Sequence, residues 1–214
     1  AISHSTRKAI LRNFDLPAER ITVVQSGIDR PTEGGAAYRT SRGEPYVLIV
    51  TNPLPHKNAI AACRGWILSR AGREGIRLRV IGGLPREALA ICQEEGARVT
   101  VESEIDDDAL ASAYRDSLFL LAPSLSEGHD LPVAEALAAG ANVLCSDIDV
   151  HREFYTGRVR MFDPWNAEAI AVAINDALDS SRPWFHTAEL VPRTFSDVAR
   201  EYERLFRTIE HRHA

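Results

Sequence analysis

Two glutamates, Glu127 and Glu135, lie on either side of a short loop that leads into a predicted helix. The apolar run 117–122 predicts a buried strand, and residues 131–139 predict a helix with Asp130 placed to cap its start. A strand, a polar loop and a helix start direct unpaired N–H groups and the positive end of the helix dipole at one point, which favours an anion. Because helical side chains lean toward the N-terminus of the helix, Glu135 points back toward this same anion-binding position. The stretch therefore predicts a site for a phosphate-bearing ligand that also carries hydroxyl groups.

Short apolar runs of strand length alternate with helical segments along the rest of the chain. The expected strands are 21–24, 46–51, 78–81, 99–101, 118–122, 142–145 and 159–162. The expected helices are 5–14, 58–70, 86–95, 107–114, 131–139, 167–178 and 196–211. This alternation predicts an α/β fold, a Rossmann-like three-layer α/β/α domain whose mainly parallel sheet is covered on both faces.

In an open parallel sheet, ligands bind at the carboxyl ends of the strands, so the loops that leave those ends are candidate walls of one site. Lys57 follows strand 46–51, Gly82 and Gly83 follow strand 78–81, and Glu127 follows strand 118–122. We expect these residues to share a rim. Lys57 would supply a point positive charge for phosphate, and the two glycines would let backbone approach closely.

The composition narrows the class of protein. The 214 residues are 45% hydrophobic and carry a formal net charge of −5, as expected of one well-cored globular domain. A mildly acidic chain without a basic run is a poor candidate for binding nucleic acid or a membrane surface, and no apolar segment approaches the roughly 18 residues of a membrane span. Cys63, Cys92 and Cys145 lack metal-ligand spacing, which indicates reduced core thiols in a cytosolic protein. Because the chain begins at Ala1, we expect it to be a piece of something longer.

Five segments resemble the C-terminal, donor-binding half of the retaining glycosyltransferases of family 4, which have the two-domain GT-B architecture. They are VVQSGID, PHKN, SEIDDDALASAY, SEGHDLPVAEALAAG, and SDIDVHREF followed by FDP. The sharpest element is a Glu, seven intervening residues and a second Glu, matched here by Glu127 and Glu135. The resemblance covers nearly the whole chain and implies one half of a GT-B fold.

The resemblance also implies roles for the two glutamates and for Lys57. Glu135 would accept hydrogen bonds from the ribose of a nucleotide sugar, and Glu127 would contact the transferred sugar near the reacting centre. Lys57 would bind the diphosphate and stabilise the charge that grows on the leaving group. Since cationic side chains do this neutralising, the resemblance implies no divalent metal and no other cofactor.

The remaining donor-binding positions would contribute mostly backbone. By resemblance these are Gly128, His129, Asp130 and Leu131 for the sugar hydroxyls and the distal phosphate, Gly82 and Gly83 for close approach, Asn52 at the rim, and Ile105 near the nucleotide base. Three departures from the usual pattern leave the donor sugar open. Asn52 stands where many relatives have Arg, Thr51 where Gly is common, and His129-Asp130 where an aromatic residue and Gly are common.

Several simpler interpretations stay open. Glu135 and Lys57 could be ordinary surface residues of helix starts, and His129 is equally a pocket residue or a loop filler. The run 106–108 is better explained as an N-cap with first-turn acids than as a metal site. Asp147 and Asp149 resemble the metal-binding Asp-x-Asp of the other glycosyltransferase architecture, which has a different fold.

We expect three parts along the chain. Residues 1–43 would be a leading interdomain segment with one helix, one strand and a flexible connector. Residues 44–195 would form the nucleotide-sugar-binding domain, and 196–214 a helix that crosses back toward an N-terminal acceptor domain missing from this chain. The isolated chain would then be inactive.

The function expected is donor binding in a cytoplasmic, retaining hexosyltransferase that uses a nucleotide-diphosphate sugar. Its acceptor would be a glycan or lipid-linked molecule of surface polysaccharide or glycolipid synthesis, and the full-length protein would lie at the inner face of the membrane. Two alternatives are a GT-B sugar-nucleotide epimerase or hydrolase half, and a non-catalytic Rossmann-like scaffold. The first would release the sugar and the second would bind no nucleotide.

Overall fold

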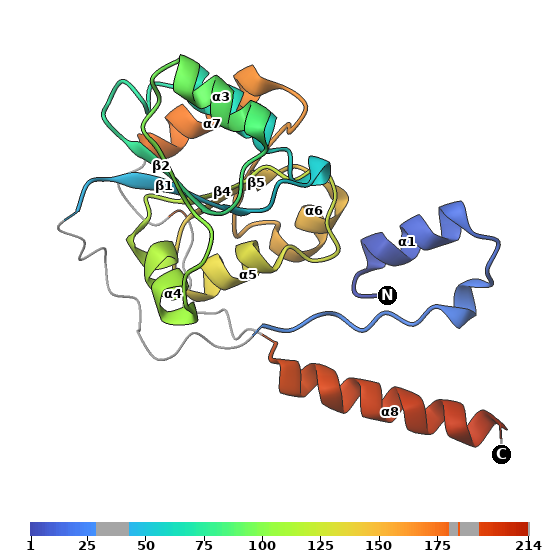
Figure 1. The fold of residues 1–214 in the computed structure, drawn as a ribbon. Coiled ribbons are helices and arrows are strands. Elements are labelled where there is room, and N and C mark those ends of the chain that lie inside the picture. The colour runs from blue at the N-terminus through green and yellow to red at the C-terminus, as the bar shows by residue number, and fades with distance from the viewer. Residues whose placement is uncertain (29–42, 180–183, 185–192, 214) are drawn as a thin grey trace.

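A six-stranded parallel sheet forms the centre of the computed structural model, which describes residues 1–28, 43–179, 184 and 193–213 (Figure 1). The strands are β1 (Tyr46–Thr51), β2 (Arg77–Gly82), β3 (Val99–Glu102), β4 (Leu120–Ala122), β5 (Val143–Ser146) and β6 (Arg160–Phe162). Every neighbouring pair is parallel, and the order across the sheet is β3-β2-β1-β4-β5-β6. The predicted parallel α/β fold is confirmed.

The described helices precede, connect and follow the strands. They are α1 (His4–Asn13), α2 (Ala59–Leu68), α3 (Arg86–Glu94), α4 (Asp107–Asp116), α5 (Leu131–Ala138), α6 (Asp149–Tyr155), α7 (Ala167–Leu178) and α8 (Phe195–His213), with 3-10 turns η1 (Ala18–Arg20) and η2 (Pro55–Lys57). All predicted helices are present with ends shifted by a few residues. Helix α6 was not predicted, because its seven residues, DVHREFY, are too few and too polar to show a helical period.

The sheet buries alternate side chains on its two faces, as the period of a strand requires. In β1, Tyr46 and Leu48 belong to the core cluster that includes residues of α4 and α5. Val47 and Ile49 belong to the opposite cluster, which includes residues of α2 and α7. Figure 1 shows α3 and α7 above the sheet and α4 and α5 below it. The three-layer arrangement is therefore the one that the alternating pattern predicts.

Strand β1 has β2 on one side and β4 on the other, so the chain order reverses between β1 and β4. Such a switch point leaves a crevice at the carboxyl ends of the two strands, because their connections run to opposite sides. The loops after Thr51 and after Ala122 leave the sheet there. These are the loops that carry Lys57 and Glu127.

The leading segment differs from its prediction. Residues 21–24 are not a strand. Two of their backbone groups pair with Ala1, from Val24 N to Ala1 O (2.8 Å) and from the Ala1 amino group to Thr22 O (2.7 Å), while Ile21 bonds Ala18 and the side chain of Arg7. A strand needs a longer ladder of partners than one residue supplies. Nearly all of the predicted connector, residues 30–43, lies outside the described residues.

Helix α1 is held by a carboxylate from another element. Glu153 of α6 accepts hydrogen bonds from the backbone N–H groups of His4 and Ser5, each at 2.8 Å. Ser3 Oγ accepts from Thr6 N at 2.9 Å, so the free amides of the first turn are satisfied. The leading segment is thereby fixed to α6, on which it packs.

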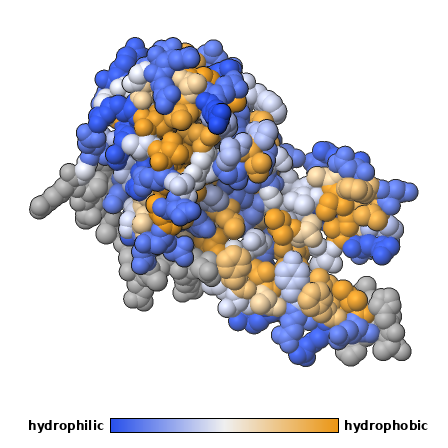
Figure 2. All heavy atoms as spheres, in the orientation of Figure 1, coloured by the Kyte–Doolittle hydropathy of each residue, from blue (hydrophilic) through white to orange (hydrophobic). Residues whose placement is uncertain are grey.

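Helices α1 and α8 present apolar side chains to the outside (Figure 2). On α8, Phe195, Tyr202, Phe206 and Ile209 are exposed despite their size. Within the described residues, no helix combines the length and the apolar character needed to cross a membrane. The three cysteines are free and buried, which confirms them as core thiols.

Close packing of α2 on α7 generates a stability prediction. A Cβ added at Gly65 of α2 would lie 2.5 Å from Ile170 Cγ2 and 3.1 Å from Ala167 O of α7. We expect Gly65→Ala to lower the free energy of unfolding by about 1–3 kcal/mol in urea titration, although Ala favours helix, because overpacking outweighs propensity. Gly72→Ala is the matched control, since nothing lies within 4 Å of its added Cβ. Equal stability of the two variants would contradict the prediction.

Candidate functional site

The site at the switch point is built around an ion pair. Lys57 Nζ, in the loop after β1, lies 2.6 Å from Glu127 Oε1, in the loop after β4. Their side chains are only 14% and 12% exposed. Two residues 70 positions apart thus meet in a partly desolvated crevice, where an ion pair is far stronger than on the open surface. The predicted meeting of Lys57 and Glu127 is confirmed.

Backbone contacts hold the two loops in this register. Leu125 N donates to His56 O at 2.7 Å, which joins the loop after β4 to η2. Asn58 begins α2 in the left-handed conformation, with φ 55°. Its Nδ2 donates to Pro123 O (3.1 Å) and Pro164 O (2.8 Å), so one amide links three strand-end loops. These hydrogen bonds therefore hold the two loops that carry Lys57 and Glu127 in a fixed relative position.

The glycines after β2 allow a close approach of backbone to the end of β1, while their predicted approach to a ligand stays a prediction. Gly82 has φ 101°, and a Cβ there would lie 2.0 Å from Thr51 O, so only glycine fits. Gly83 N donates to the same Thr51 oxygen at 3.1 Å. Asn52 uses its Oδ1 to accept from Leu54 N at 3.1 Å, which holds the turn that leads to η2.

Glu135 of α5 is partly buried and has a partner that the sequence did not reveal. Tyr114 OH of α4 donates to Glu135 Oε2 at 2.9 Å. Burial raises the pKa of the Glu135 carboxyl, and the hydrogen bond from Tyr114 opposes that rise. Ile105, in the loop before α4, packs against the core cluster on this face. Glu135 is thus an oriented acceptor, not a freely solvated helix residue.

The predicted cap of α5 is wrong. Asp130 occupies the N-cap position with φ 67°, and its side chain makes no capping bond. Its carboxylate instead lies 2.9 Å from His151 Nε2, and both side chains are buried. The left-handed backbone turns the carboxylate into the protein, away from the amides that it was expected to cap.

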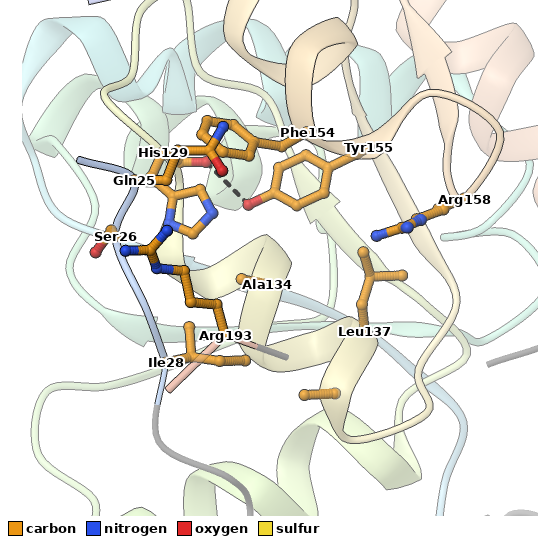
Figure 3. Close-up of a pocket in the computed structure, with 11 residues that line it drawn as sticks. Gln25, Ser26, Ile28, His129, Ala134, Leu137, Phe154, Tyr155, Arg158 and Arg193 are labelled. Carbon is orange, nitrogen blue, oxygen red and sulfur yellow. Dashed lines mark hydrogen bonds between the residues drawn. The ribbon is translucent and has the colours of Figure 1, made fainter. Parts of the chain in front are cut away.

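The ring of His129 lies in a hollow of about 160 Å³ between α5, α6, the leading segment and Arg193 (Figure 3). It packs on Phe154 with ring centroids 4.3 Å apart, and burial lowers its pKa. Tyr155 OH donates to the backbone oxygen of His129 at 2.9 Å. Lys57, Glu127 and Glu135 do not line this hollow, so the His129 side chain faces a different space from theirs.

The acidic runs considered as metal sites have other partners. Asp106 Oδ1 accepts from Ala109 N at 2.7 Å, which confirms it as the N-cap of α4. Asp147 pairs with Arg152 at 2.5 Å, which lowers the pKa of that carboxyl, and Asp149 lies 3.6 Å from Lys8. In the part of the chain that the structure describes, no three His, Cys, Asp or Glu side chains are grouped as metal ligands.

A family model described as "Glycosyl transferases group 1" matches residues 44–180. The chain belongs to this family. The matched residues include the whole six-stranded sheet and both loops of the ion pair.

Individual relatives are more distant than the family match. The O-antigen chain mannosyltransferase RfbU of Salmonella typhimurium is 23% identical over 180 residues, which cover 82% of this chain and 49% of that protein. Sucrose-phosphate synthase from Thermosynechococcus elongatus has a TM-score of 0.75 at 20% identity, covering 97% of this chain and 57% of that one. A TarM mutant from S. aureus, solved with fondaparinux, α-GlcNAc-glycerol and UDP, has a TM-score of 0.70 at 15% identity, covering 84% and 36%. The chain thus has the fold of a GT-B half and spans about half the length of RfbU.

Sequence reasoning missed three residues that shape the site of this glycosyltransferase. Tyr114, Tyr155 and His151 each bond a residue of the Glu127–Glu135 stretch from another helix. None belongs to a catalytic motif, and the contacts span 21 to 26 positions. The available signal was that Tyr114 and His151 lie inside SEIDDDALASAY and SDIDVHREF, two of the segments that carry the family resemblance, and that Tyr155 follows the second.

Burial of Glu135 predicts the pH dependence of stability. A carboxyl whose folded pKa is raised above its ordinary 4.5 contributes stability below that pH, and the contribution is lost as pH rises through the folded pKa. Glu135→Gln is uncharged at every pH and still accepts from Tyr114. We therefore expect the variant to unfold at a higher urea concentration than the wild type at pH 7. The difference between the two unfolding midpoints should disappear below pH 4.5.

The exposed Glu94 of α3 is the matched control for this measurement. Glu94→Gln should follow the wild type across the same pH range. A Glu135→Gln protein that is less stable than the wild type at pH 7 would show that the charged form is the one the fold favours.

Proposed function

We propose that this chain is the donor-binding domain of a retaining hexosyltransferase that takes a nucleotide-diphosphate sugar. The observation that carries the proposal is the Lys57–Glu127 pair across the switch point. Lys57 would be the cation for a phosphate and Glu127 the carboxylate for a sugar, and the two lie within one hydrogen bond of each other. A dinucleotide site would need no such pair beside the phosphate.

Lys57 would exchange partners when the donor binds. In the structure its ammonium is held by Glu127 in a crevice that is poor in water. A diphosphate offers more negative charge, so the ammonium would turn to it, and the freed Glu127 would accept hydrogen bonds from the sugar. When the bond between the anomeric carbon and the phosphate oxygen breaks, Lys57 would neutralise the charge left on that oxygen.

Glu135 and the backbone of residues 128–131 would complete the donor site. Glu135 would accept from the ribose hydroxyls, for which the Tyr114 hydrogen bond orients its carboxylate. The N–H groups of residues 128–131 have no acceptor among the described residues, and they lie at the positive end of α5. They would bind the distal phosphate and sugar hydroxyls, and backbone near Ile105 would meet the base. Neutralisation by Lys57 leaves no step that requires a divalent metal.

The wider function is inferred from the relatives. RfbU is named as an O-antigen chain mannosyltransferase, and the TarM structure holds UDP. These names support hexose transfer from a sugar nucleotide. The acceptor would be a glycan or lipid-linked molecule of surface polysaccharide or glycolipid synthesis, and transfer would take place at the cytoplasmic face. A separate N-terminal domain would bind the acceptor, and the exposed apolar side chains of α8 would pack on it. The chain by itself would then bind the donor without transferring it.

The first test is calorimetric titration of this chain with UDP, GDP, ADP and dTDP, in buffer with EDTA and again with Mg²⁺. We expect one nucleotide to bind, equally well in both buffers. Glu135→Ala should weaken it by about 1–3 kcal/mol, because a charged hydrogen-bond acceptor is lost. Ser112→Ala, also on α4, is a control, because it removes a hydroxyl that bonds Arg115 and leaves the Tyr114–Glu135 hydrogen bond in place. No binding by the wild type at millimolar nucleotide would overturn the donor-site proposal and favour a scaffold.

Opposite substitutions of the ion pair give a sharper prediction. Lys57→Gln should weaken binding of the nucleoside diphosphate by about 2–4 kcal/mol, since the phosphate loses its cation and Glu127 is left unpaired beside it. Glu127→Gln should bind the diphosphate at least as tightly as the wild type, because Lys57 no longer has to leave a partner.

Titration with a sugar nucleotide then distinguishes the proposed role of Glu127 from that of Lys57. With the matching sugar nucleotide, Glu127→Gln should lose the gain in affinity that the sugar gives the wild type. Equal weakening of diphosphate and sugar nucleotide by Glu127→Gln would count against a contact between Glu127 and the sugar.

A further inference from the structure

We infer that His151 is a positioning residue for the donor site: it holds the Asp130 carboxylate inside the protein, so that the start of α5 stays open to the distal phosphate. This inference rests on the proposed donor-binding function. It concerns a residue that lies outside the loops at the switch point, on helix α6. His151 would touch neither the donor nor the acceptor.

Asp130 and His151 form a buried dyad in which both ring nitrogens of the histidine have a hydrogen-bond partner. His151 Nε2 lies 2.9 Å from Asp130 Oδ2, and His151 Nδ1 lies 2.7 Å from the backbone oxygen of Ser146, at the end of β5. The His151 and Asp130 side chains are 0% and 2% exposed. The ring is thus fixed at one nitrogen by the sheet and uses the other to hold the carboxylate.

Hydrogen-bond chemistry requires an extra proton in the dyad. A carbonyl oxygen can only accept, so His151 Nδ1 must donate to Ser146. Nε2 faces a carboxylate, which accepts when ionised, so the ring must be charged or the carboxylic acid must be protonated. In the first form the charged ring balances the carboxylate and in the second Asp130 is neutral, so in neither does an unpaired negative charge stand in the core.

The alternative position of the Asp130 carboxylate would oppose donor binding. Asp130 is the N-cap residue of α5, and an N-cap carboxylate ordinarily accepts from the free amides of the first turn. It would then accept from Val133 N, since Pro132 has no N–H, and place a negative charge beside the amides of residues 128–131 that are proposed for the phosphate. With His151 in place, the carboxylate is turned away and only the Asp130 carbonyl is used, by Val133 N at 3.1 Å and Ala134 N at 3.3 Å.

A second residue of α6 supports the same backbone. Tyr155 OH lies 2.9 Å from the carbonyl oxygen of His129 and 3.1 Å from that of Asp130, and it donates to this pair of acceptors (Figure 3). The carbonyls of the loop therefore point toward α6. In a loop whose carbonyls are held on one side, the N–H groups are left for a ligand on the other.

The test is a double-mutant cycle between the two members of the dyad, read by titration with the nucleoside diphosphate that the wild type binds and with its monophosphate. His151→Leu removes both donors and should weaken the diphosphate about tenfold, the size expected for an opposing charge at a helix terminus, with the monophosphate nearly unchanged. His151→Gln keeps one amide donor and should weaken it less. Asp130→Gly accepts the positive φ and removes the carboxylate, so Asp130→Gly/His151→Leu should bind the diphosphate nearly as the wild type does.

Controls separate positioning from general loss of structure. Ile174→Ala in α7, buried on the opposite face of the sheet, destabilises the protein without approaching the dyad. If His151→Leu weakens diphosphate and monophosphate alike, as Ile174→Ala would, or if Asp130→Gly gives no rescue, the inference is overturned while the donor site stands. If His151→Leu does not fold, the same comparison of diphosphate and monophosphate affinity is made with His151→Gln, once in the wild-type chain and once together with Asp130→Gly. If the wild type binds neither nucleotide, the proposed function fails and this inference fails with it.

Discussion

The desolvated pair of Lys57 and Glu127 is the constraint on which the rest of the site depends. Two charges in a crevice are tolerated only when they meet at hydrogen-bond distance, and here they do so at 2.6 Å from opposite sides of the switch point. Any shift of the loop after β1 against the loop after β4 would separate them and leave each without a counter-charge. The bracing by Asn58 and by the His56–Leu125 bond follows from that requirement.

The α5 side of the site obeys a different rule, in which partners come from neighbouring helices and not from the loop itself. Tyr114 of α4 orients Glu135, and His151 and Tyr155 of α6 bond residues 129 and 130. The stretch from Glu127 to Glu135 is thus bounded by α4 on one side and α6 on the other. Its shape is a property of the layer below the sheet, not of the loop sequence.

What the sequence could predict was local or followed from topology. Strands, helices and the meeting of Lys57 with Glu127 follow from hydrophobic period and from the rule that ligands bind where parallel strands end. Asp130 was mistaken for a cap, because capping is the usual local use of an aspartate before a helix, and a buried histidine 21 positions away competes for it. Residues 21–24 failed as a strand for the same kind of reason. Strand propensity is local, but a ladder needs a partner strand, and among the described residues the backbone of 22 and 24 pairs with the single residue Ala1.

The capping of α1 by Glu153 has a mechanical consequence. The first-turn amides of α1 bond a carboxylate of α6, and α6 also carries the histidine and tyrosine that bond residues 129 and 130. Glu153 and His151 stand two positions apart on this helix, so a rotation of α1 that displaced Glu153 would also displace His151 and, with it, Asp130. The seven residues of α6 therefore couple the position of the leading helix to the conformation of the loop before α5.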